Sequence, residues 1–203
     1  MNAINLFNKW VDLGKDDGMV TNHRPSVDYM ISLIPKTLIS QKFSFIDIGC
    51  GNGWVVKQLS SMSKCSCAVG IDGAINMIKK ARLKDQQSDY IQLDINNLES
   101  YKKQFDIVFS MEVLYYLSNP KNTLSHIYSN LLNDGGCCII GIDHYLENKP
   151  SLTWEKQLNV PLCTYSISEW TKIFSSVGFK NVNFFQFGKT EKWAGTLILY
   201  AEK

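Results

Sequence analysis

The hydrophobic positions of the chain follow two alternating periods. Short apolar runs, typical of strands buried on both faces, are separated by segments in which apolar residues recur every three or four positions, as on one face of a helix. The predicted strands are 43–48, 67–71, 90–93, 105–109 and 137–142, and the predicted helical faces are 27–34, 55–62, 74–81 and 124–131. This alternation predicts a parallel sheet covered by helices on both faces.

The last quarter of the chain predicts one further helix and two further strands. Ser166 and Glu169 match a capping box, and Gly178 is well placed to end the helix that follows it. The strands 182–187 and 195–201 are joined by a link too short for a crossover helix, so they are expected to be antiparallel neighbours. The predicted fold is α/β, a doubly wound, Rossmann-like sheet of seven strands that is mostly parallel, with one antiparallel strand near the C-terminus.

The length of 203 residues fits one domain with at most a short addition. Pro25 is a favoured residue for a first helical turn, so the first core helix is expected to begin there. Residues 1–24, with polar residues and two glycines after a short amphipathic start, are expected to form a helical lid over the main domain, 25–203. Residues 147–164 lack a clean period and are expected to be an insertion near the active site.

Composition narrows the class of protein. With 45% hydrophobic and 20% charged residues the chain is globular, and a net charge of +2 gives no electrostatic argument for DNA or an anionic membrane. The N-terminus has no apolar core of signal-peptide length, and no apolar run approaches the ~20 residues of a membrane span, so a cytoplasmic location is expected. The six cysteines form no CxxC pair and predict free thiols rather than a zinc site.

The strongest candidate binding motif is the loop Asp47-Ile48-Gly49-Cys50-Gly51-Asn52-Gly53, which follows the first predicted strand. A strand that enters a glycine-rich turn and then a helix lets backbone N–H groups approach a nucleotide-like ligand. A dinucleotide fingerprint needs GxGxxG, whereas this loop reads GxGxG with Trp54 at the sixth position. The spacing therefore disfavours a nicotinamide dehydrogenase.

From this loop onward the sequence resembles the class I S-adenosylmethionine-dependent methyltransferases. The acid-x-Gly-x-Gly-x-Gly loop is followed by Asp72 at the end of the second strand, Asp94 after the third, Phe105-Asp106-Ile107-Val108-Phe109-Ser110 in the fourth, and a leucine-rich stretch that ends in Gly135-Gly136. The resemblance covers residues 43–143 motif by motif, and the closing strand pair extends it to the C-terminus.

The resemblance implies S-adenosylmethionine as cofactor and S-adenosylhomocysteine as its product. Asp72 would accept hydrogen bonds from both ribose hydroxyls, since a carboxylate offers two acceptor oxygens. Asp94 would face the adenine amino group, and the less favoured alternative is that it only caps the following helix. The implied cofactor-binding set is Asp47, Gly49, Cys50, Gly51, Gly53, Asp72, Gly73, Met77, Asp94, Ile95 and Met111.

Methyl transfer from a sulfonium is an in-line displacement that needs positioning more than a catalytic triad, and a base helps only a protonated nucleophile. Candidates at the ends of the fourth and fifth strands include Glu112, Tyr116 and His144. His144 is the preferred base because imidazole titrates near neutrality, but a packing role is as well supported. Tyr116 and, from the lid, His23 are the other catalytic candidates. Ser110 stands where metal-dependent catechol methyltransferases present an acid, so no metal site is expected.

The expected activity is methyl transfer to O or N of a small-molecule acceptor. Two alternatives remain open: a methyltransferase acting on tRNA or protein, and a non-catalytic module that keeps the fold. The acceptor itself cannot be read from the sequence, because the lid and residues 147–164 lie outside the resemblance.

Overall fold

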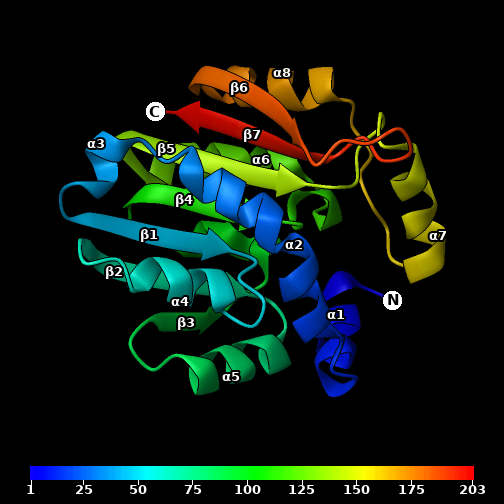
Figure 1. Cartoon of the computed structure of the whole chain (residues 1–203), viewed down its shortest axis with the longest axis horizontal. Coiled ribbons are helices and arrows are strands. Elements are labelled where there is room, and N and C mark those ends of the chain that lie inside the picture. Colours follow the sequence, from blue (N-terminus) through cyan, green and yellow to red (C-terminus); the bar gives the residue numbers. More distant parts are fainter.

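The computed structural model describes all residues from Met1 to Lys203 and contains one seven-stranded sheet in the order β3-β2-β1-β4-β5-β7-β6 (Figure 1). The strands are β1 Phe43–Ile48, β2 Cys65–Asp72, β3 Asp89–Gln92, β4 Phe105–Met111, β5 Leu132–Ile142, β6 Lys180–Phe187 and β7 Thr196–Glu202. The pairs β1–β2, β2–β3, β1–β4 and β4–β5 are parallel, whereas β7 runs antiparallel to both β5 and β6. The predicted fold class and the antiparallel pair are confirmed.

Helices and short helical turns connect these strands. The α-helices are α1 Ala3–Asp12, α2 Lys15–Ser32, α3 Lys36–Ile39, α4 Trp54–Ser60, α5 Ile75–Lys84, α6 Pro120–His126, α7 Trp154–Leu158 and α8 Ile167–Val177. Three 3₁₀ segments, Ile95–Ser100, Leu114–Tyr116 and Lys149–Thr153, and a π-helical turn at Ile127–Leu131 complete the connections. The predicted capping box is present, because the hydroxyl of Ser166 accepts from the N–H of Glu169 and the Glu169 carboxylate accepts from the N–H of Ser166.

Alternate side chains of the strands feed two hydrophobic cores, one on each face of the sheet. Ile46 and Ile48 of β1 point into the core that α6 and α8 cover, while Phe43 and Phe45 point into the core that α2, α4 and α5 cover. Continuous apolar strands are thus buried on both faces, as expected for a parallel sheet. None of the helices combines the length and the apolar character that crossing a membrane requires.

Two predicted element boundaries are wrong. The helix expected from Pro25 begins at Lys15 and includes Pro25, so residue 24 lies inside α2. Its first turn contains Asp16 and Asp17, and acids are favoured near a helix N-terminus; this polar part gives no hydrophobic period. The strand expected from residue 137 begins at Leu132, and the pairing of β4 with β5 shifts between Phe105 and Ile107.

The carboxyl ends of the parallel strands form one edge of the sheet, and α1 and α7 lie at this edge (Figure 1). The ligand crevice of an open α/β sheet lies at this edge. The lid expected over residues 1–24 corresponds to α1 and the first half of α2, and the segment 147–164 contains α7.

Candidate active site

The loop after β1 has glycine at three positions, and each glycine is needed for a different reason. Gly49, Gly51 and Gly53 all have positive φ angles, of 81°, 53° and 78°. A Cβ on Gly49 would lie 2.1 Å from Cγ2 of Val113, so no side chain fits there. A Cβ on Gly51 would meet only the sulfur of Met77, at 4.0 Å, because Gly51 borders an open space. Gly53 instead packs against Tyr90 and does not line that space.

Asp72, at the end of β2, is hydrogen-bonded to the glycine loop. Its carboxylate accepts hydrogen bonds from the backbone N–H groups of Gly51, at 2.9 Å, and Ala74, at 2.7 Å. Burial raises the pKa of Asp72 to about 6, even though these two donors act in the opposite direction. Asp47 is 2% exposed, and its pKa is raised well above the usual range, first by burial and then by the nearby Asp72.

The space around the loop is an acidic cavity. The residues that line it include three acids of the strand ends, Asp47, Asp72 and Glu112, but no lysine or arginine. Asn52 also lines this space, and the carbonyl oxygen of its buried side chain has no hydrogen-bond partner. Such a lining repels a diphosphate and suits a ligand that carries positive charge, such as a sulfonium with an ammonium group. Three features of this cavity fit S-adenosylmethionine. They are the open space beside Gly51, the unpaired carbonyl oxygen of Asn52 and the acidic lining.

A second, adjoining cavity extends along the ends of β2 and β3. Asp72, Gly73, Asp94 and Ile95 line it, and Ile4 and Phe7 of α1 cover it. The carboxylate of Asp94 accepts from the backbone N–H of Asn96, at 2.9 Å, so it caps the following 3₁₀ turn while bordering the cavity. Met77 and Met111 line the first cavity. Apart from Gly53, all the residues of the implied cofactor-binding set lie around these two spaces.

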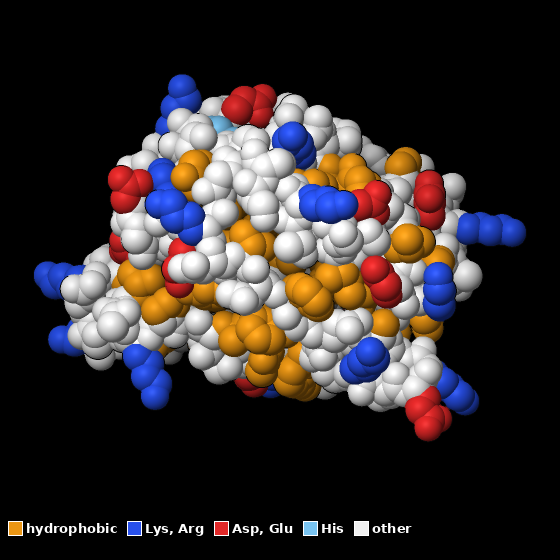
Figure 2. Space-filling view, turned by 90° about the horizontal axis from the view of Figure 1, so that it is seen from above, with side chains coloured by type: hydrophobic (Ala, Val, Ile, Leu, Met, Phe, Trp, Pro, Cys, Tyr) orange, Lys and Arg blue, Asp and Glu red, His pale blue; other side chains and the backbone are white.

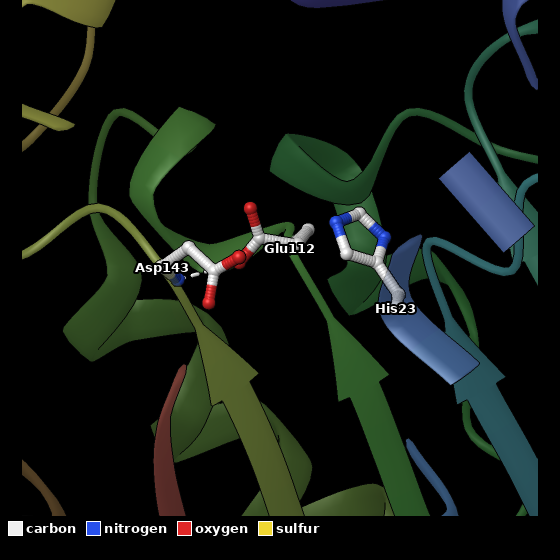
Figure 3. A group of neighbouring side chains, drawn as sticks. All are labelled: His23, Glu112 and Asp143. Atoms are coloured by element: carbon white, nitrogen blue, oxygen red, sulfur yellow. Dashed lines mark hydrogen bonds between the residues drawn. The ribbon is translucent and has the colours of Figure 1, made fainter. Parts of the chain in front are cut away.

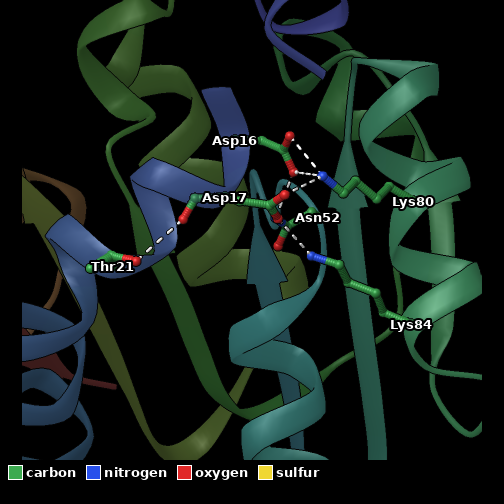
Figure 4. A network of polar contacts seen from close by, with 6 residues as sticks. All are labelled: Asp16, Asp17, Thr21, Asn52, Lys80 and Lys84. Carbon is green, nitrogen blue, oxygen red and sulfur yellow. Dashed lines mark hydrogen bonds and ion pairs between the residues drawn. The ribbon is translucent and has the colours of Figure 1, made fainter. Parts of the chain in front are cut away.

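A polar network ties the lid to the cofactor side (Figure 4). Lys80 of α5 forms ion pairs with Asp16, at 2.7 Å, and Asp17, at 3.0 Å, and Lys84 pairs with Asp17 at 3.2 Å. The side-chain amide of Asn52 also donates to Asp16, at 2.8 Å. The side chain of Asp16 is 1% exposed, so the first turn of α2 is fixed against both the glycine loop and α5.

The largest cavity near the loop has a volume of about 570 Å³ and lies on the other side of Glu112. Its walls come from three places in the chain: the lid, the turn after β4, and α7. The lining aromatic residues are Phe7, Trp10, Tyr115, Tyr116 and Trp154. Four residues, Phe7, Met19, His23 and Glu112, line both this cavity and the acidic one. The two spaces therefore meet at these side chains.

His23, Glu112 and Asp143 form a cluster at this junction (Figure 3). One potential ligand atom from each lies within 4.8 Å of the other two. Glu112 has a φ of 63°, rare for a residue other than glycine, and its carboxylate accepts from the hydroxyl of Tyr115, at 2.6 Å, and from the N–H of Asp143, at 2.5 Å. Burial and the neighbouring Asp143 raise the pKa of Glu112 well above its usual range, while burial lowers the pKa of His23.

The structure does not bring the three catalytic candidates together. His23 and Tyr116 line the large cavity, but His144 does not. The Nδ1 of His144 faces the carbonyl of Ser151, at 3.0 Å, and can only donate to it, so Nε2 accepts from the Thr164 hydroxyl, at 2.7 Å. Burial lowers the pKa of His144. Both ring nitrogens of this neutral imidazole are already used, which supports the packing role.

Sequence reasoning missed part of the site. The sequence named Glu112 and the lid residue His23 as catalytic candidates, but nothing in it indicated that these two side chains would meet beside Asp143. Phe7 and Trp154 were missed because the segments that contain them carry no recognisable motif. Their positions depend on how α1 and α7 pack across the sheet edge.

Comparison with known proteins agrees with this geometry. A family model described as "Methyltransferase domain" matches residues 39–186. The chain is 32% identical over 120 residues to methyltransferase 235L of Invertebrate iridescent virus 6, covering 57% of this chain and 44% of that protein. It is 27% identical over 170 residues to the tRNA U34 carboxymethyltransferase of Campylobacter jejuni, covering 76% and 55%. The chain thus spans about half the length of these two relatives.

Among solved structures, a methyltransferase of Haloferax volcanii in complex with the Trm112 methyltransferase activator superposes with a TM-score of 0.83. It is 22% identical, and the match covers 97% of this chain and 96% of that one. This likeness confirms the fold. The fold and the acidic strand-end cavity define an S-adenosylmethionine-binding α/β domain. The chain belongs to the methyltransferase domain family and is a class I S-adenosylmethionine-dependent methyltransferase domain.

Proposed function

We propose that this chain transfers a methyl group from S-adenosylmethionine to an oxygen or nitrogen of a small-molecule acceptor. The observation that carries the proposal is the shared wall between the acidic cavity and the 570 Å³ cavity. Clefts and cavities of about 300–1,000 Å³ are typical of small-ligand sites. An acceptor in the large cavity would meet the cofactor's methyl group at Glu112 and His23, which border both spaces.

The proposal assigns the cofactor to the residues around the glycine loop. Asp72 would hold the ribose hydroxyls, and Asp94 and Ile95 would border the adenine. Asp47, Gly49 and Gly51 would border the methionine part. Gly53 would act indirectly, because it allows α4 to begin tightly against Tyr90. The bound cofactor supplies an activated methyl group, and the chain's own residues orient the acceptor and exclude water from it.

The acceptor would lie between aromatic walls. The ring of Tyr116 packs edge-on against Phe7, with centroids 5.3 Å apart, and Phe7 packs in the same way against Trp10. Burial and Glu112 raise the pKa of Tyr116, so its hydroxyl stays protonated and can donate to an acceptor rather than deprotonate it. His23 is the one imidazole that faces the acceptor space, and in its neutral form it can accept a proton from a hydroxyl or ammonium nucleophile.

The second candidate is methylation of RNA or protein. The match to the tRNA enzyme and the likeness to an activator-bound methyltransferase favour it. A nucleic-acid acceptor would need a basic surface beside the cavity. On the face in Figure 2, lysines and arginines are dispersed singly among acids and neutral side chains. This view looks down on the β6 side of the molecule, whereas the cavity lies at the strand-end edge, where its lining contains one lysine, Lys15, and no arginine. A lining with so little positive charge supports the small-molecule proposal.

Transfer of a labelled methyl group separates these proposals. The protein is incubated with methyl-tritiated S-adenosylmethionine and a deproteinised, RNA-free metabolite extract, and in parallel with total RNA and with a dialysed protein extract. Label that accumulates only in the metabolite reaction supports a small acceptor. Label in RNA or protein would support the second candidate, and cofactor binding without transfer to any of the three would indicate a non-catalytic module.

A further inference from the structure

The cluster His23–Glu112–Asp143 has features that methyl transfer to a simple acceptor does not require. Two carboxylates lie side by side with little exposure, 9% for Glu112 and 7% for Asp143. Neither takes part in any of the ion pairs of the structure, which all involve Lys80, Lys84 or Lys203. Burying two neighbouring carboxylates without a compensating cation is costly.

One buried oxygen atom of the cluster has no hydrogen-bond partner. Oδ1 of Asp143 is inaccessible to water and has no hydrogen-bond partner. An unpaired buried acceptor of a carboxylate calls for a donor or a cation. Because the Asp143 ligand atom lies within 4.8 Å of those of Glu112 and His23, a single cation can contact all three.

The carboxylate of Glu112 is also held in place by two hydrogen-bond donors. The hydroxyl of Tyr115 and the backbone N–H of Asp143 both donate to it. Hydrogen bonds to the coordinating carboxylates are characteristic of metal sites, where they orient the ligands. Two ligand atoms of one divalent ion with bonds of about 2.0–2.2 Å lie about 3–4.4 Å apart, so three atoms within 4.8 Å of one another can converge on one ion after small side-chain rotations.

We propose that His23, Glu112 and Asp143 form a binding site for one divalent cation at the junction of the two cavities. One imidazole and two carboxylates suit Mn²⁺, Fe²⁺ or Zn²⁺. Since His23 and Glu112 line the large cavity, the open coordination positions of the ion would face the acceptor. With the ion bound, the coordinating nitrogen of His23 would no longer be free to accept a proton, and the ion would lower the pKa of a coordinated hydroxyl instead. The substrate class is then an acceptor that presents an oxygen ligand, such as a hydroxyl beside a carbonyl or a second hydroxyl. The inferred class of acceptor rests on the proposed function, whereas the inferred binding of a cation does not. This proposal departs from the sequence-based expectation of no metal site.

Titration of the whole chain with MnCl₂ tests the site by electron paramagnetic resonance, because the six-line signal of free Mn²⁺ is lost on binding. The chain is first treated with EDTA and dialysed. We expect one Mn²⁺ per chain, and at least tenfold weaker affinity in Glu112→Gln and in Asp143→Asn. The surface variant Glu191→Gln, which changes an exposed carboxyl, should bind as the wild type does.

Two further variants test the geometry. His23→Gln should also weaken Mn²⁺ binding at least tenfold, while His126→Gln, which alters a histidine bonded to the carbonyl of Tyr101, should not. Tyr115→Phe keeps all three ligands and removes only the donor to Glu112, so a smaller loss is expected. Circular dichroism and S-adenosylhomocysteine titration of each variant show that it is folded.

Mn²⁺ affinity that is the same in wild type and in a Glu112→Gln/Asp143→Asn double variant would overturn the proposal. Methylammonium bound more tightly than Mn²⁺ by the wild type would also overturn it and would assign the acids to an amine. Neither result bears on the proposed function, which the labelled-methyl experiment decides separately.

Discussion

The cofactor side and the acceptor side of the site are built from different kinds of structure. The cofactor side consists of strand ends and the turns directly after them, anchored in both hydrophobic cores and closed by backbone hydrogen bonds to Asp72. The acceptor side consists of α1, the start of α2 and α7, which lie across the sheet edge and meet it through side chains. The difference implies that changes on the cofactor side alter folding and cofactor affinity, whereas changes on the acceptor side alter which molecule is methylated.

The largest difference between the two sides is expected in how much stability is lost when a glycine with positive φ is replaced by alanine. Gly49→Ala should lower the free energy of unfolding by about 2–5 kcal/mol, from roughly 1–2 for the left-handed backbone and roughly 1–3 for overlap with Val113. Gly14 in the lid also has a positive φ, of 66°, but an added Cβ there would meet no atom within 4 Å. Gly14→Ala should therefore lower the free energy of unfolding only by the cost of the left-handed backbone, about 1–2 kcal/mol. Urea denaturation measures both. Equal losses would show that the loop is no more rigid than the lid.

Cofactor affinity should depend on Asp72 and not on α7. Asp72→Ala should weaken S-adenosylhomocysteine binding by about 1.5–3 kcal/mol, because charge-assisted hydrogen bonds are lost. Trp154→Ala, on the acceptor side, should leave that dissociation constant within about twofold while lowering methyl transfer. Calorimetric titration of both variants provides the measurement. An unchanged constant for Asp72→Ala would place the ribose elsewhere.

The lid network offers a comparison between two lysines of α5. Lys80→Ala removes the cation from the buried Asp16 and should lower the free energy of unfolding by about 1–3 kcal/mol. Lys84→Ala breaks an exposed pair with Asp17 and should cost less than about 0.5 kcal/mol. Thermal denaturation, with limited proteolysis to detect release of α1, tests the pair. Equal effects would mean that Asp16 does not anchor the lid.

The pH dependence of binding should follow Asp72. Its pKa of about 6 in the free protein means that the carboxylate is ionised above pH 6 and protonated below it. Ribose hydroxyls donate to the ionised form, so S-adenosylhomocysteine affinity should be constant above pH 7 and fall as pH drops through 6. The limiting slope is about tenfold, or 1.4 kcal/mol, per pH unit. Titrations between pH 5 and 8 check this, and Asp72→Asn should flatten the profile. A profile of the same shape in Asp72→Asn would assign the titration to another group.

The contrast between the cofactor side and the acceptor side also explains which features could be predicted from the sequence. Strand order, the antiparallel pair and the residues around the glycine loop follow from local patterns, because a glycine turn or an acid at a strand end has the same neighbours wherever the fold occurs. His144 was misleading because its place after β5 is at the crevice, yet its ring turns toward Ser151 and Thr164. The start of α2 at Lys15 and the meeting of His23 with Asp143 depend on packing between distant segments. No local period records such contacts.

The acidic strand-end cavity is expected to bind S-adenosylmethionine rather than a dinucleotide. Calorimetric titration of the chain with S-adenosylmethionine and, separately, with NAD tests it most directly. We predict one S-adenosylmethionine site per chain, weakened about 10- to 150-fold in Asp72→Ala, and no heat of binding with NAD. Binding of NAD without binding of S-adenosylmethionine would contradict the account.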